Sequence, residues 1–272
     1  MKKTLILVHG SKEHIGRYKE FIDTLEGKGI NVIAKDLKCH GKNLNDSFHN
    51  FSFEDILNST LDMIDNSMKN TDNSETYIMG HSFGSFIIKY IIYNNLRTFD
   101  GVILSGTNHM SNNLINLAIS LTSKGDKNKV NKLLEFMSFG VLGIKSLLHN
   151  GSKRWLSKSK ENNESYKKDP LCGKHYSKQS LNTVFKFMRD SKQDNTLSNF
   201  NDKNINQLII YGKKDPVNNF GKEIKKLTKS YDKFKISNYS VIEYKNSRHE
   251  IIFDIEKEKV IGDIIEFIKT NS

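Results

Sequence analysis

The sequence predicts an α/β fold with about six mostly parallel strands and helices on both faces of the sheet. Short β-rich apolar runs recur along the chain, and helical patterns separate most of them. A composition of 36% hydrophobic and 10% aromatic residues is that of a globular chain able to bury a core. The predicted strands are TLILV (4–8), INVIA (30–34), TYIMG (76–80), GVILS (101–105), QLIIY (207–211) and YSVIEY (239–244).

Helices are predicted between these strands, where apolar residues recur at three- and four-residue spacing. Strands that alternate with helices in this way pair in parallel. The predicted helices are 16–28, 53–69, 82–94, 221–230 and 249–269.

The alternation stops between Ser105 and Gln207, where no strand is predicted. LINLAISL, VNKLLEFM and LNTVFKFM predict amphipathic helices there, joined by a Lys, Ser and Asn-rich loop around residues 150–168. We therefore expect a core of residues 1–107 and 204–272, with residues 108–203 inserted as a helical cap.

GHSFGS (80–85) matches the GxSxG pattern with Ser82 at its centre. A predicted strand precedes the motif and a predicted helix follows it. This context lifts the serine hydroxyl above the sheet edge, next to a helix N-terminus that favours negative charge. Ser82 is therefore the candidate nucleophile, and an incidental Gly-rich turn is the alternative.

A serine nucleophile needs a base and a group that orients the base. Asp215 follows the fifth strand in YGKKDPV, and His249 follows the sixth in SRHE. Each lies just past the carboxyl end of a strand, where side chains from parallel strands meet. Ser82, Asp215 and His249 form the predicted triad, although a single Asp or His in such a place is usually structural.

An acyl-transfer site also needs N–H donors for the developing oxyanion. The amide after the nucleophile belongs to Phe83. The first strand runs into His9 and Gly10, a turn that can direct the Ser11 amide to the same point. The alternative for this segment is an ordinary turn after a strand.

Five segments, HGSKEHIGRY (9–18), DLKCHGKN (36–43), GHSFGS, GKKDPV and SRHE, carry a resemblance to known enzymes. In order and spacing the chain resembles α/β-hydrolases of the monoacylglycerol lipase, lysophospholipase and serine-aminopeptidase-like group. The resemblance implies Ser82 as nucleophile, Asp215 and His249 as its partners, and the amides of Ser11 and Phe83 as the oxyanion hole. It also implies a helical cap at the position of the insertion.

The chain departs from the group pattern at several positions. In GHSFGS, Phe83 replaces the usual Met and Ser85 replaces the second Gly. In DLKCHGKN, Lys38, Cys39 and Asn43 replace Arg, Gly and Ser. Because the chain begins at the strand that leads into the oxyanion turn, we expect the group's usual first two strands to be absent.

A net charge of +11 admits nucleic acid, an anionic membrane or an anionic substrate as partner. The cap holds 17 Lys and Arg against 8 Asp and Glu, which leaves only +2 for the core. Lys153, Arg154, Lys158 and Lys160 flank Trp155, a pattern suited to contact with anionic lipid. A solvated loop is the alternative. No nucleic-acid recognition motif is present, so no nucleic-acid partner is predicted.

The apolar residues of the cap predict either the lining of an acyl tunnel or the cap's own packing. Few acidic groups are available there to hold a substrate ammonium. We therefore predict hydrolysis of monoacylglycerol or lysophospholipid esters through an acyl-Ser82 intermediate. The alternatives are a serine aminopeptidase-like or other small-ester or thioester hydrolase, and a non-catalytic ligand-binding homologue. The apolar positions are Leu114, Leu117, Leu121, Leu133, Phe136, Met137 and Phe139.

Neither a metal site nor a cofactor is predicted, because the histidines form no HxH or HExxH pattern. Cys39 and Cys172 are too few and too far apart for a disulfide framework, which favours a reducing compartment. The apolar run after Lys2 and Lys3 is shorter than a signal core of about 7–15 residues. A cytoplasmic location is expected, with peripheral membrane contact left open together with the oligomeric state.

Overall fold

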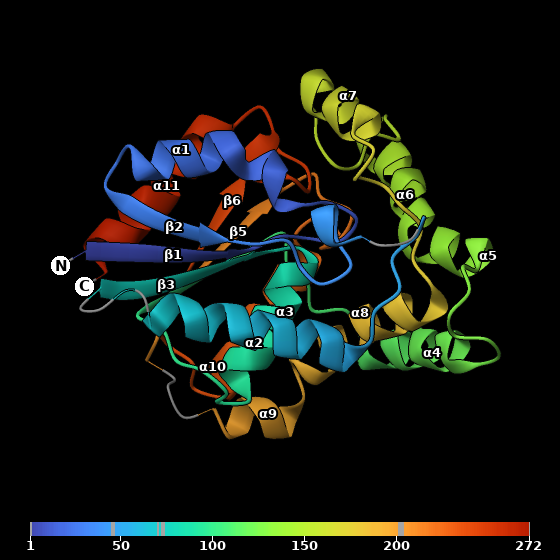
Figure 1. The fold of residues 1–272 in the computed structure, drawn as a ribbon, viewed down its shortest axis with the longest axis horizontal. Helices are drawn as coiled ribbons and strands as arrows, with labels where there is room; N and C mark the ends of the chain where they lie inside the picture. The colour runs from blue at the N-terminus through green and yellow to red at the C-terminus, as the bar shows by residue number, and fades with distance from the viewer. Residues whose placement is uncertain (1, 45–46, 70, 72–73, 201–203, 272) are drawn as a thin grey trace.

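A computed structural model describes most of the chain, with short gaps. Within it, six strands form one sheet in the order β2-β1-β3-β4-β5-β6 (Figure 1), and all five neighbouring pairs are parallel. The predicted fold class is confirmed. The strands are β1 (Lys2–Val8), β2 (Ile30–Ala34), β3 (Ser74–His81), β4 (Gly101–Ser105), β5 (Asn206–Gly212) and β6 (Tyr239–Tyr244). The described residues are 2–44, 47–69, 71, 74–200 and 204–271.

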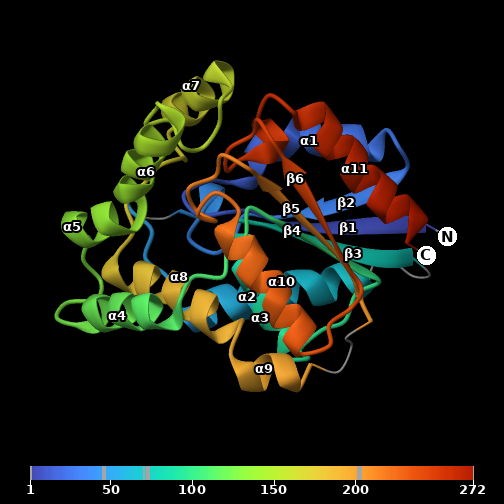
Figure 2. The same cartoon turned by 180° about the vertical axis from the view of Figure 1, so that it is seen from behind.

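Helices cover both faces of the sheet, because successive strand residues point to opposite sides. In β1, Leu5 and Leu7 pack with α1 and α11, whereas Ile6 and Val8 pack with α2, α3 and α10. Figures 1 and 2 show these two layers from opposite sides. We call the sheet and these five helices the body. The helices are α1 (Lys19–Glu26), α2 (Phe53–Lys69), α3 (Phe83–Tyr93), α10 (Lys222–Lys233) and α11 (Lys257–Thr270).

The last predicted helix begins later than expected. A 3-10 turn occupies Ile251–Phe253, and α11 starts only at Lys257. Asp254 has an extended backbone, and its carboxylate accepts hydrogen bonds from the amides of Arg248 (2.7 Å) and Lys158 (2.8 Å). These bonds hold the segment against neighbouring loops and keep it out of the helix.

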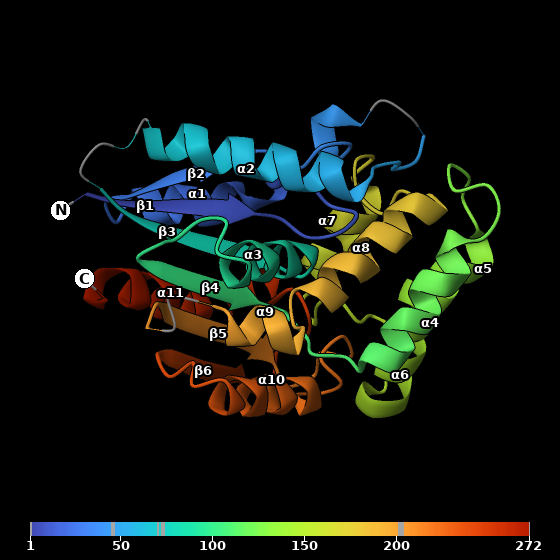
Figure 3. The same ribbon diagram turned by 90° about the horizontal axis from the view of Figure 1, so that it is seen from below.

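The chain between β4 and β5 forms a separate group of helices, called the cap helices below. Figures 1 and 3 place most of them beyond the carboxyl ends of the strands, with α4, α5 and α6 close together. A single π-helical turn, Phe136–Gly140, joins α5 to α6. The cap helices are α4 (Asn112–Ser123), α5 (Lys132–Glu135), α6 (Val141–Asn150), α7 (Lys160–Lys168), α8 (Lys178–Asp190) and α9 (Asp194–Ser198).

The prediction of a loop through residues 150–168 is wrong for its second half, which forms α7. Ser159 caps this helix by accepting a hydrogen bond from the Asn162 amide at 3.1 Å. Its sequence, KENNESYKK, has one aromatic residue and no aliphatic one, so apolar periodicity could not reveal it.

Most of the apolar cap residues neither line an acyl tunnel nor form the cap's own packing, the two roles that the sequence predicted. Leu114, Leu117, Leu133, Phe136 and Met137 are between 52% and 67% exposed, so they neither line a tunnel nor pack inside the cap. The periodicity identified amphipathic helices correctly, but it could not show that these side chains face outward. No helix in the described part of the chain is long and apolar enough to cross a membrane.

Candidate active site

Ser82 occupies a sharp turn between β3 and α3. Its backbone has φ 51° and ψ −114°, a conformation that L-residues adopt only under constraint. Two glycines make the turn possible. A Cβ at Gly80 would lie 2.5 Å from the Gly84 backbone, and one at Gly84 would lie 2.3 Å from the Val8 carbonyl oxygen. The close packing of strand and helix therefore presents Ser82 as a nucleophile elbow.

The structure brings Ser82, His249 and Asp215 into one hydrogen-bonded chain. His249 Nε2 lies 2.9 Å from Ser82 Oγ, and His249 Nδ1 lies 2.9 Å from Asp215 Oδ2. The Asp215 carboxylate also accepts from the Val217 amide at 2.7 Å and from Asn218 Nδ2 at 3.1 Å. A carboxylate only accepts, so Nδ1 carries the imidazole proton and Nε2 is free to receive one from Ser82.

The electrostatics of the site favour a basic His249 beside a neutral His81. Burial alone would lower the pKa of His249, but the charge and hydrogen bond of Asp215 outweigh it, so the pKa is raised above 6.5. Burial lowers the pKa of the adjacent His81 to about 4. The two rings lie 5.0 Å apart, and the neutral His81 places no positive charge against a protonated His249.

The two predicted oxyanion donors have free amides. The Ser11 N–H donates to no acceptor among the described residues, and Phe83, as the first residue of α3, has no helical acceptor for its own. A Cβ at Gly10 would lie 3.2 Å from Ser82 Cβ, so the turn before Ser11 packs directly on Ser82. The Phe83 side chain is buried in the core against Phe51, away from the cavity.

A buried ion-pair network lies beside His249, and the sequence did not predict it. Arg17 forms a two-pronged pair with Glu250 at 2.7 and 2.8 Å and also contacts Glu13 at 2.5 Å. Burial would raise the pKa of Glu250, but the guanidinium of Arg17 lowers it to about 2. The signals available were a Glu directly after His249 and the i,i+4 spacing of Glu13 and Arg17.

Comparison with known proteins identifies the family. The family model described as serine aminopeptidase, S33, matches residues 1–256. The chain belongs to the S33 family. Among curated relatives, the phospholipase YtpA of Bacillus subtilis (strain 168) is 28% identical over 122 residues, which is 44% of this chain and 46% of that protein. The monoglyceride lipase of Mus musculus is 30% identical over 103 residues, 38% of this chain and 34% of that protein. The chain thus spans less than half the length of these relatives.

Solved structures share the fold of this S33-family chain. A carboxyl esterase from Bacillus coagulans superposes with a TM-score of 0.87 at 21% identity, covering 98% of this chain and 89% of the esterase. The monoacylglycerol lipase of Paleococcus ferrophilus gives 0.73 at 21% identity, covering 99% and 95%. At this level of identity the likeness shows the fold.

A cavity in this S33-family chain runs between the body and the cap helices, and Ser11, Ser82 and His249 line it. Trp155 also lines it, with its ring centroid 5.4 Å from that of His249. The expected interfacial role of Trp155 is therefore wrong, because the indole packs over the catalytic base candidate. The apolar lining comprises Phe86, Met110, Phe139, Leu142, Leu156, Leu181, Val184, Phe185, Met188, Pro216 and Val217.

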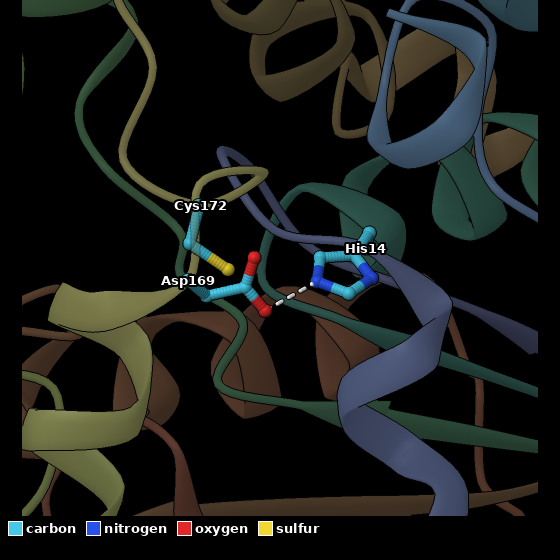
Figure 4. A group of neighbouring side chains, drawn as sticks. All are labelled: His14, Asp169 and Cys172. Atoms are coloured by element: carbon cyan, nitrogen blue, oxygen red, sulfur yellow. Dashed lines mark hydrogen bonds and ion pairs between the residues drawn. The ribbon is translucent and has the colours of Figure 1, made fainter.

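One group of side chains has the composition of a metal site. His14, Asp169 and Cys172 place a ligand atom each within 4.8 Å of the others (Figure 4). However, His14 Nδ1 accepts from the Gly16 amide at 3.2 Å, so Nε2 carries the proton and donates it to Asp169 at 2.8 Å. Both ring nitrogens are thereby engaged, and the group fits a hydrogen bond between body and cap better than a metal centre.

Proposed function

We propose that this S33-family chain is a serine hydrolase that cleaves carboxylic esters of acyl lipids, monoacylglycerol or lysophospholipid. The observation that carries the proposal is the chain of 2.9 Å contacts from Ser82 through His249 to Asp215. A serine in a sharp turn, next to a histidine of raised pKa and a carboxylate, is the arrangement that activates a hydroxyl near neutral pH.

The proposed reaction proceeds in two steps through an acyl-serine. His249 Nε2 takes the Ser82 proton as the oxygen attacks the ester carbonyl, and the amides of Ser11 and Phe83 bind the oxyanion. The tetrahedral intermediate collapses, and protonated His249 delivers its proton to the leaving alcohol. A water molecule then attacks the acyl-serine with His249 again as base. Throughout, Asp215 holds the imidazole and stabilises its cation.

The cavity favours an acyl chain over a substrate ammonium. Most of its lining is apolar, which suits a hydrocarbon chain next to Ser82. Its two acidic residues, Glu13 and Glu250, are both paired with Arg17, so neither is free to bind an aminopeptidase substrate. Lys145 lines the opening and is exposed, which suits an anionic or neutral leaving group. The similarity to a phospholipase and to monoglyceride lipases supports the same substrate class.

The proposal is tested by hydrolysis of a p-nitrophenyl ester and by labelling with a fluorophosphonate. Ser82→Ala should abolish both, whereas Ser67→Ala, which removes a buried hydroxyl from α2, should leave both intact. Persistent turnover in Ser82→Ala contradicts the assignment. If the wild type is neither active nor labelled, the chain is a non-catalytic binding homologue instead.

Substrate class is tested with esters of graded acyl length, lysophospholipids, a thioester and aminoacyl arylamides. We expect kcat/KM to rise with acyl length and to be lowest for the arylamides. A preference for arylamides would favour the aminopeptidase-like alternative, and a preference for short esters or the thioester would favour the small-substrate one.

We also propose that residues 108–203 act as the cap of the site and contact an anionic membrane from a cytoplasmic location. Three cap segments expose apolar side chains at three- and four-residue spacing, and Leu133 and Leu148 are 67% and 83% exposed. Together with the excess of lysine in the cap, this surface combines apolar insertion with attraction to anionic lipid. The apolar surface comprises Leu114, Leu117, Leu133, Phe136, Met137, Ile144, Leu147 and Leu148.

Vesicle-binding assays separate the contribution of the exposed apolar residues to membrane binding from that of the basic residues. The triple change Leu117→Ser, Leu133→Ser and Leu148→Ser should abolish binding to phosphatidylglycerol vesicles, while Ile255→Ser, at a residue of the body that is also exposed, should not. Reversal of Lys153, Arg154, Lys158 and Lys160 to Glu should weaken binding in a salt-dependent manner. Unchanged binding in both sets of variants would contradict membrane contact through the cap.

A further inference from the structure

The loop that carries the Ser11 amide, residues 9–14, is held by the cap as well as by the body. We call it the oxyanion loop. The Lys12 carbonyl accepts from the Gly173 amide and from the Tyr166 hydroxyl, both at 2.9 Å. The Lys12 amide donates to the Tyr176 hydroxyl at 3.1 Å. Both peptide groups of the residue after Ser11 are therefore bonded to residues of the cap.

Tyr176 is held in place by contacts other than those with the oxyanion loop. Its side chain is fully buried, and its ring packs against Phe51 and His49 with centroids 5.3 and 4.9 Å away. The backbone on either side bridges to His49, through His49 N to His175 O at 2.8 Å and Ser177 N to His49 O at 2.9 Å. The phenol oxygen thus has a position set by packing on all sides.

The hydrogen bonds around the Tyr176 hydroxyl have a defined direction. His40 Nδ1 lies 3.0 Å from the Lys38 carbonyl, which can only accept, so Nδ1 is protonated and Nε2 is an acceptor. Burial lowers the pKa of His40 well below its usual value, which keeps the ring neutral. His40 Nε2 therefore accepts from the Tyr176 hydroxyl at 2.7 Å. The lone pairs of that oxygen are left to accept, and one accepts from the Lys12 amide.

A second residue of the cap supports the same arrangement. Glu135 is buried, accepts from the Tyr176 amide at 2.8 Å and also pairs with the Lys12 ammonium. At the far end of the oxyanion loop, the bond between His14 and Asp169 gives a further link between body and cap (Figure 4). Lys12 and His14 are consequently both bonded to residues of the cap between Glu135 and Tyr176.

We propose that Tyr176 is a positioning residue that orients the Ser11 amide toward the oxyanion, so that the oxyanion hole is complete only with the cap docked. The inference rests on the proposed function. Tyr176 does not touch the reacting atoms. Its hydroxyl is held by the buried His40 and in turn holds the Lys12 amide by a hydrogen bond. The Ser11 N–H belongs to the adjacent peptide, so its orientation depends on this bond. A displaced cap would release these bonds and leave the donor unaligned.

Tyr176→Phe removes only the hydroxyl and leaves the ring among its aromatic neighbours. We expect kcat for a soluble ester to fall roughly tenfold to a hundredfold, less than the loss of a whole oxyanion donor, with KM within about twofold. Affinity for a boronic acid, whose adduct with Ser82 places an oxygen in the oxyanion hole, should fall in parallel. Tyr93→Phe is the matched control, since Tyr93 is a buried tyrosine of the body that bonds Gln207 at 2.8 Å.

The overturning result is a Tyr176→Phe protein whose kcat and boronic acid affinity both match those of Tyr93→Phe. Amide hydrogen exchange in residues 9–18 gives a readout that does not need activity, and we expect faster exchange there in Tyr176→Phe and in Glu135→Gln. Equal exchange in these variants and the wild type also overturns the inference. An inactive wild type would refute the proposed function, whereas the exchange result would still decide the positioning of the loop.

Discussion

The body and the cap helices use the same residue types in opposite ways. In the body, the leucines and isoleucines of the four inner strands, β1, β3, β4 and β5, are at most 2% exposed, and Arg17 is enclosed by two carboxylates. In the cap, Leu133 and Leu148 are exposed, and basic residues outnumber acidic ones by nine. The body is stabilised by what it buries, whereas the outer surface of the cap leaves apolar and basic side chains exposed to solvent.

The candidate site lies where the two parts meet, and each supplies something different. The body holds Ser82, Asp215 and His249 at the ends of β3, β5 and β6. The cap supplies walls such as Leu142 and the indole of Trp155. This division can be broken or sharpened by paired substitutions, one in each part.

The largest difference is expected in turnover. Asp215→Asn should lower kcat by roughly 10⁴, because the imidazole loses the acceptor that fixes its tautomer. Leu142→Ala in the cap wall should instead raise KM for a long-chain ester severalfold, with kcat within about threefold, since it removes uniform binding. Steady-state kinetics on one substrate compares the two. A large fall in kcat for Leu142→Ala would show that the cap takes part in the chemical step.

The next difference concerns ion pairs and stability. Arg17→Gln leaves Glu13 and Glu250 buried without their partner, and we expect a loss of about 3–5 kcal/mol in urea unfolding. Lys129→Gln breaks an exposed pair of the cap, Lys129 with Asp126 at 3.3 Å, and should change stability by less than about 0.5 kcal/mol.

The effect of Arg17→Gln should also depend on pH. Arg17 holds the folded-state pKa of Glu250 at about 2, below its ordinary value of 4.5. The stabilisation from this group is therefore present above pH 4.5 and is lost as the pH falls toward 2. Urea unfolding curves of wild type and variant should therefore differ at neutral pH and converge as the pH is lowered toward 2. A difference that stays constant with pH would contradict the ion-pair explanation.

Replacing one leucine in each part by alanine tests how much the burial of that side chain contributes to stability. Leu104→Ala in β4 removes a fully buried side chain and should cost about 2–5 kcal/mol. Leu148→Ala in α6 shortens a side chain that is 83% exposed, so the free energy of unfolding should stay within about 0.5 kcal/mol. Thermal or urea unfolding measures both. A large loss for Leu148→Ala would mean that the apolar surface of the cap is covered in solution.

The parts of the structure that the sequence predicts are those that local patterns determine. Parallel strands buried on both faces appear as short continuous apolar runs, which is why TLILV and GVILS were recognised. Ser82 was identified from its glycines, and their spacing is required by the 2.3 and 2.5 Å approaches at Gly84 and Gly80. Asp215 and His249 followed from the rule that strand ends converge.

The rest depends on contacts between distant segments. Arg17 and Glu250 are 233 positions apart, and nothing local indicates their pairing. Trp155 among lysines has the composition of a membrane contact, yet the packing of the cap on the body turns it toward His249. The periodicity of LINLAISL and VNKLLEFM likewise predicts an apolar stripe on α4 and α5 without showing what covers it.

The smallest expected effect couples the two parts through Trp155. Burial lowers the pKa of His249, while Asp215, Glu250 and Glu13 raise it to a net value above 6.5. His249 must be neutral to accept the Ser82 proton, so kcat/KM should rise with pH through this pKa. Trp155→Ala admits water to the imidazole and so weakens the effect of burial on the pKa of His249, which should move the midpoint upward by less than about one pH unit. Trp155→Phe keeps an apolar ring in place and should leave the midpoint near that of the wild type.

An upward shift of the midpoint in Trp155→Ala alone would show that the cap controls the solvation of a base held by the body. Equal midpoints in all three proteins would instead assign the pKa of His249 to the body.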